Sequence, residues 1–161
     1  MRATMWYLAV LIAFVTLSPH SYSQTVGKRL EGITSVRISA SDLNEEAMDC
    51  GVTKEGLRSA AMSPVATSKL RLGEGSSVIL EIEVLAGELF SGPCIAAYRL
   101  QLVTHQNVEL NGTQLERFIK IQLWERNRMI WGPKDEFATQ IRDAIEELTK
   151  EFVVEWTLDQ Q

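Results

Sequence analysis

The sequence is poor in the residues that most enzymes and metal sites use. Only two histidines and two cysteines occur among its 161 residues, and general acid–base catalysis relies most often on histidine. The Gly-x-Ser-x-Gly, glycine-rich phosphate-binding and His-Glu-x-x-His motifs are missing as well. Acid–base chemistry is therefore left to carboxylates or a histidine, and neither a metal nor a cofactor is expected.

Glycine and proline are few, and basic residues are outnumbered by acidic ones. Ten glycines and four prolines are too few for a collagen-like or low-complexity chain. The formal net charge is −5 and no block of lysine or arginine is present, so nucleic acid is not an expected partner, because phosphate binding needs concentrated positive charge. Two cysteines are too few for a miniprotein built on disulfides.

The most apolar stretch lies at the amino terminus. Arg2 precedes an apolar run of thirteen residues, and the small residues Ser21 and Ser23 follow it. This order predicts a secretory signal peptide over residues 1–23, cleaved before Gln24. Retention as an amino-terminal anchor is the alternative, although about 20 apolar residues are needed to cross a bilayer. The cleaved chain is expected to be periplasmic or secreted, without an integral membrane span.

After the signal peptide we expect a flexible lead-in over residues 24–34 and a single domain over residues 35–161. Alternating apolar and polar residues predict long strands over 78–85, 94–104 and 118–124, and short strands near 35–39 and 69–72. Links of about ten residues or fewer favour an antiparallel β-meander. Asn111-Gly112 is a tight-turn signal, and with Thr113 it also fits the N-glycosylation pattern.

Residues 133–157 carry the strongest helical pattern. Its apolar residues recur at steps of three and four: Phe137, Ile141, Ala144, Ile145, Leu148, Phe152 and Trp156. A shorter helix is expected between Thr53, which can cap it, and Pro64, which would end it. The fold class is therefore α+β, with the long carboxy-terminal amphipathic helix and the shorter helix packed on one face of the meander.

Cys50 and Cys94 form an even pair in a chain expected to be exported, which predicts a disulfide between them. The alternatives are a catalytic thiolate with His105 as its base and a zinc site. The pair lacks the spacing of zinc ligands, and nothing in the sequence places His105 beside either cysteine.

Glu81 and Glu83 project from the same face of one predicted strand. Paired carboxylates can hydrolyse a glycoside when they flank the sugar in a cleft. Neighbouring positions on a sheet rarely form a cleft, and Arg99 is a plausible cross-strand partner of Glu81. A solvated charged face is therefore the simpler interpretation.

The face of the sheet away from the long helix is the candidate binding face. Aromatic and charged residues alternate on it, as at partner surfaces. The candidate residues are Glu81, Glu83, Arg99, Gln101, Phe118, Lys120 and Trp124. Alternatively, the shorter helix or a loop over residues 105–114 covers Phe118 and Trp124.

The order of these elements resembles small exported bacterial α/β proteins of unassigned function. The resemblance is carried by Cys50-Gly51-Val52-Thr53 with Leu57, the meander, the 124–132 segment and the final helix ending in Phe152 and Trp156, and spans roughly residues 35–157. It departs at residues 60–68, where small residues replace a longer amphipathic helix. It implies an envelope location and supplies no catalytic residues.

These observations predict an exported, non-enzymatic binding or accessory domain of the cell envelope, with a protein or envelope component as its partner. One alternative is a small carboxylate-based hydrolase of an envelope polymer. Another is a secreted inhibitor that presents a loop such as Gly87–Pro93 to a foreign enzyme.

Overall fold

The computed structural model describes residues 29–89, 92–110 and 113–161, with the backbone alone between residues 107 and 118. The expected signal peptide and the Asn111-Gly112 turn lie outside these described residues. No helix within them is long and apolar enough to cross a membrane.

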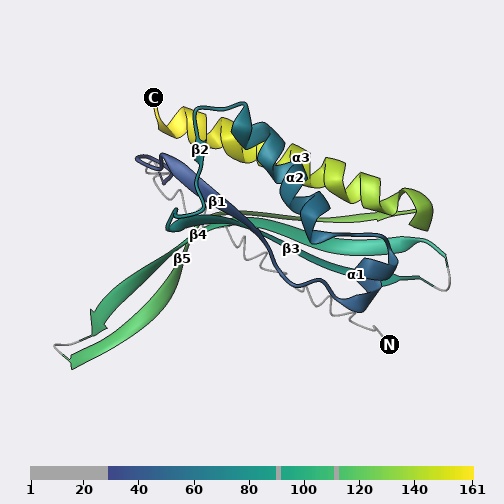
Figure 1. Ribbon diagram of the computed structural model, residues 1–161, viewed down its shortest axis with the longest axis horizontal. Helices are drawn as coiled ribbons and strands as arrows, with labels where there is room; N and C mark the ends of the chain where they lie inside the picture. The colour runs from purple at the N-terminus through teal and green to yellow at the C-terminus, as the bar shows by residue number, and fades with distance from the viewer. Residues whose placement is uncertain (1–28, 90–91, 111–112) are drawn as a thin grey trace, which may run out of the picture.

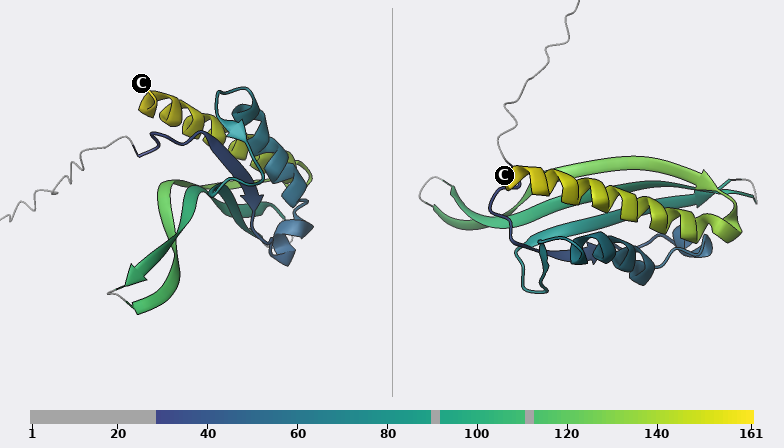
Figure 2. Two further views of the ribbon diagram at one scale, coloured as in Figure 1. Left: turned by 60° about the vertical axis from the view of Figure 1, so that its left-hand side comes forward. Right: turned by 90° about the horizontal axis from the view of Figure 1, so that it is seen from above.

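Five strands form one sheet in the order β2-β1-β3-β4-β5, and two long helices cover one of its faces (Figure 1). The elements follow the chain as β1 (Ser35–Ala40), α1 (Glu45–Asp49), α2 (Lys54–Ala66), β2 (Arg71–Leu72), β3 (Val78–Glu88), β4 (Cys94–Leu110), β5 (Thr113–Gly132) and α3 (Lys134–Asp159). Figure 2 shows α2 and α3 lying side by side on the sheet. The α+β class and the long final helix are thus confirmed.

The sheet is mixed, so the prediction of a purely antiparallel meander is wrong. β3, β4 and β5 are antiparallel neighbours, but β1 runs parallel to both β2 and β3. The cause is the connection after β1, which contains α1 and α2. A helical connection of this length carries the chain back to the start of the sheet, as parallel pairing requires.

β4 and β5 form a hairpin much longer than the sequence analysis expected. Their pairing runs from Cys94 opposite Gly132 to Leu110 opposite Thr113. The far part of this hairpin projects from the body as a two-stranded arm (Figure 1). Residues 105–110 therefore belong to β4, and the interpretation of 105–114 as a covering loop is wrong.

A β-bulge changes which residues of β5 face the helices. Leu102 pairs with Trp124, but the next residue, Val103, pairs with Gln122, which leaves Leu123 as the extra residue. Side chains alternate between faces with a period of two, so one inserted residue reverses the faces beyond it. Trp124 therefore lies on the helix side, and its placement on the opposite face is wrong.

The core lies between α2, α3 and the sheet. The predicted apolar stripe of α3 faces it: Phe137, Ile141, Ile145, Leu148, Phe152 and Trp156 are all buried. Thr53 caps α2 as predicted, since its Oγ1 accepts from the Gly56 N–H at 3.1 Å. The helix then continues through Pro64 to Ala66, two residues beyond the predicted end.

Ile141 provides a test of this core. The side chain is fully buried in the middle of the α3 stripe. We expect Ile141→Ala to lower the free energy of unfolding by about 2–5 kcal/mol, because transfer and cavity terms add. Urea unfolding of the two proteins measures the difference. A loss below about 1 kcal/mol would show that α3 does not pack as described.

Two further contacts join segments that are distant in the sequence, one at each end of the sheet. The predicted disulfide is present: Cys50 and Cys94 are bonded, with their Cα atoms 6.2 Å apart. It joins the end of α1 to the start of β4. At the other end the Leu30 N–H donates to Asp159 at 3.0 Å, so the expected flexible lead-in is anchored from Leu30 onward.

Candidate binding face

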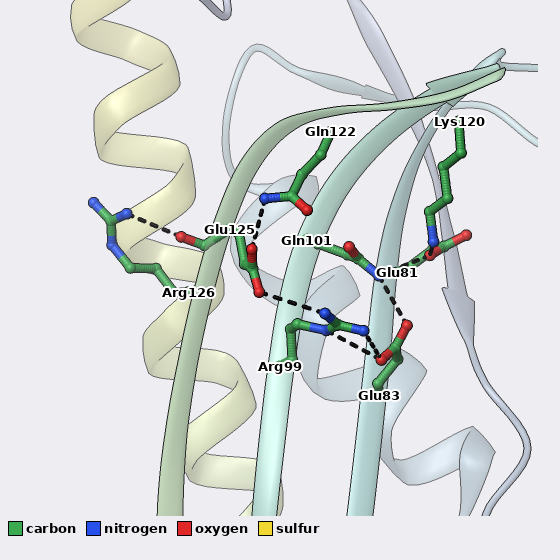
Figure 3. A network of polar contacts seen from close by, with 8 residues as sticks. All are labelled: Glu81, Glu83, Arg99, Gln101, Lys120, Gln122, Glu125 and Arg126. Carbon is green, nitrogen blue, oxygen red and sulfur yellow. Dashed lines mark hydrogen bonds and ion pairs between the residues drawn. The ribbon is translucent and has the colours of Figure 1, made fainter. Parts of the chain in front are cut away.

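The face of β3, β4 and β5 opposite the helices is called the open face here. The registers place its residues in rows across the three strands. Its middle is polar and its end nearest the β3–β4 connection is apolar. The polar part, the polar network, consists of Glu81, Glu83, Arg99, Gln101, Lys120, Gln122 and Glu125 (Figure 3).

Gln101 is the buried centre of the polar network. Its side chain is only 2% exposed, and its Nε2 donates to Glu81 at 3.1 Å and to Glu83 at 2.8 Å. The Gln101 amide thus donates to both carboxylates, which lie on the same face of β3 and would otherwise repel each other. Lys120 completes this side with an ion pair to Glu81 at 2.5 Å.

Arg99 links the remaining members of the network. Its guanidinium donates to Glu83 through Nε at 3.1 Å and lies 3.5 Å from Glu125, which accepts from Gln122 at 2.6 Å. The hydrogen bond with Glu83 raises the pKa of Arg99 above its ordinary value. Both Arg99 and Lys120 are about two-fifths exposed, and ion pairs so exposed contribute little to stability.

The geometry does not favour the chemical alternatives. Glu81 and Glu83 lie on one strand within an ion-pair network, not on two sides of a sugar-sized cleft as glycoside hydrolysis requires. The thiolate alternative is excluded because both cysteines are in the disulfide. Within the described residues no group of three or more His, Cys, Asp or Glu is placed to hold a metal ion.

Beside the polar network lies a group of exposed apolar side chains, the apolar patch, made of Leu85, Ala97, Met129 and Trp131. Leu85 is 67% exposed, Met129 70% and Trp131 73%. Leu85 and Met129 both pair with Ala97, which puts the three in one row across the sheet. Trp131 occupies the next row, opposite Ile95.

A hollow of about 830 Å³ begins at the apolar patch. Its floor includes Leu85, Ala97 and Met129, and the chain between β1 and α1 contributes Ser41 and Asp42 at one side. Glu83 and Arg99 close it toward the polar network. The open face therefore offers an apolar floor with charged groups on its borders.

The structure brings most of the predicted site residues together. Glu81, Glu83, Arg99, Gln101 and Lys120 belong to the polar network. Trp124 lies on the helix side of the sheet, where its ring packs on Phe152 with centroids 5.3 Å apart. The side chain of Phe118 lies outside the described residues.

Met129 and Trp131 are not among the predicted site residues, because the third long strand is predicted to end at residue 124, before either of them. The available signal was the length of the preceding strand together with the alternation in Asn127, Met129 and Trp131. A long strand in a hairpin needs a partner of similar length, which extends the last strand to Gly132.

The fold and this face define an α+β protein with a one-sided helical layer and an exposed sheet face. No protein-family model matches the chain, and no curated protein matches it. Among solved structures it is similar to a crystal structure of a minor lipoprotein from Acinetobacter baumannii, with 9% identity and a TM-score of 0.34, covering 79% of this chain and 94% of that chain.

Proposed function

We propose that this chain is an exported binding protein of the cell envelope that docks a protein partner on its open face. The observation that carries the proposal is the apolar patch. Three large apolar side chains, each at least two-thirds exposed, gather on the uncovered side of the sheet. Single exposed apolar residues are ordinary, whereas a contiguous group marks an interaction surface.

The composition of the open face supports a protein as the partner. Tryptophan, methionine and arginine are enriched at protein–protein interfaces, and binding energy concentrates in aromatic and arginine anchors. Trp131 and Met129 supply the apolar anchors, and the polar network beside them supplies a charged border. The buried disulfide supports the exported location, because such bonds persist in oxidising compartments.

Site-specific photo-crosslinking tests the proposal in the intact envelope. A photoreactive amino acid is placed at Met129, and the same residue is placed at Leu158 as a control. Leu158 is also strongly exposed, at 60%, but lies in the last turn of α3. We expect a discrete protein adduct from position 129 and none from position 158.

Trp131→Ala in the Met129 crosslinking protein should remove that adduct, because a central aromatic anchor dominates binding. Identical adducts from positions 129 and 158, or an adduct that survives Trp131→Ala, would contradict the proposal. Circular dichroism melting of each protein checks that the fold is unchanged.

A further inference from the structure

We propose that the partner segment docked on the apolar patch is basic and amphipathic, with lysine or arginine flanking its apolar side chains. This inference rests on the proposed function and specifies the chemistry of the partner. It follows from the charges around the patch, which are concentrated in the segments that border it at this end of the sheet.

The border on the β3 side is strongly acidic. Residues 41–49, which form the connection after β1 and α1, carry four acidic residues and no basic one. This segment is fixed against the end of β3, because the Asn44 side chain bonds both the N–H and the carbonyl of Ala86. Asp42 lines the hollow itself and pairs with Lys54.

The border at the end of the sheet is acidic as well. Glu88 ends β3, and Asp135 and Glu136 stand exposed in the first turn of α3. Lys134 is the one basic residue among them and is paired with Glu88 at 2.9 Å. The segments at this end of the sheet therefore carry seven carboxylates and two ammonium groups, those of Lys54 and Lys134.

This distribution selects among possible occupants. Complementary charge speeds encounter and suppresses wrong partners, so an excess of carboxylates favours a cationic segment. Trp131 adds a second preference, because an exposed indole face attracts lysine and arginine. Two cations line the hollow, Arg99 and Arg128. Arg99 is paired with Glu83 and Glu125, and Arg128 with Glu151. An anionic lipid surface would be repelled by the same border.

Binding of designed peptides to the full domain tests the inference. The probes are a dye-labelled amphipathic peptide of leucine and lysine and a matched peptide of leucine and glutamate. Fluorescence anisotropy measures their affinities at low and at high salt. We expect the lysine peptide to bind at least about tenfold more tightly, with a preference that shrinks at high salt because exposed charges are screened.

Two pairs of variants locate the binding. Trp131→Ala should weaken the lysine peptide about tenfold or more, whereas Leu158→Ala, an exposed apolar control, should not. The double variant Glu45→Gln/Asp49→Asn should reduce the preference for lysine several-fold. Its control, Glu31→Gln/Glu74→Gln, removes two exposed acids elsewhere and should leave the preference unchanged.

Three outcomes would overturn the inference: equal affinity for both peptides, no binding of the lysine peptide, or Trp131-dependent binding to phosphatidylcholine–phosphatidylglycerol vesicles in place of peptide. The photo-crosslink from position 129 is independent of these outcomes. An adduct with a protein whose docked segment is not basic would keep the proposed function and reject the basic partner.

Discussion

Replacing Trp124 with alanine should lower the free energy of unfolding by about 3–5 kcal/mol, the range for truncation of a buried large aromatic. The indole is 7% exposed, packs on Phe152 and donates from Nε1 to Glu155 at 2.9 Å. The substitution leaves a cavity between β5 and α3 and removes one of two partners of Glu155, the other being Arg126. Chemical unfolding monitored by circular dichroism measures the loss.

Trp131→Ala is the matched control, because the same residue type lies seven positions along the same strand and is 73% exposed. Its truncation should change the free energy of unfolding by no more than about 0.5 kcal/mol, as for most surface positions. Equal losses for Trp124 and Trp131 would contradict both the bulge at Leu123 and the division of β5 between core and open face.

Removal of the disulfide should be comparably destabilising. The bond joins Cys50 to Cys94 across 44 residues, and the chain-entropy relation for a loop of this length gives about 4 kcal/mol. Both cysteines are buried, so Cys50→Ala/Cys94→Ala also loses some packing. Urea unfolding of the oxidised wild type and of the double variant provides the comparison.

A reducing agent supplies the control for that experiment. It should destabilise the wild type and leave the double variant unchanged, because the variant has no disulfide to lose. A difference below about 1 kcal/mol between oxidised and reduced wild type would mean that the linked segments stay ordered without the bond. The position of α1 beside the patch would then not depend on the disulfide.

The parts of the fold that depend on the residue pattern within a single segment were predicted correctly. The α3 stripe, the Thr53 cap and the alternation in β3 each follow from the periodicity of one segment. Strand order and direction depend on contacts between distant segments, which periodicity does not encode. The parallel pairing of β1 with β3 therefore had no signal in either strand alone.

The error at Trp124 has a different physical origin. Alternation through 119–124 is correct as a pattern, but the inserted Leu123 reverses the faces within the strand. No residue type in the sequence signals this bulge, since leucine at position 123 is common in regular strands. The common face of Glu81, Glu83, Arg99 and Gln101 was predictable because these residues lie on two regular strands before any bulge. The predicted pairing of Arg99 with Glu81 is wrong, because the register places Arg99 opposite Glu83.

The contact between Leu30 and the end of α3 determines how the molecule can be held. Gln160 donates to the Leu30 carbonyl at 2.7 Å, so the first described residues and Gln161 emerge at the same end of the domain (Figure 1). α3 has 26 residues and is therefore about 39 Å long, and Trp131 lies on β5, three residues before the other end of α3. A tether attached at Gln161 is therefore separated from the end of the sheet that carries Trp131 by about the length of α3, which leaves the apolar patch open to a partner.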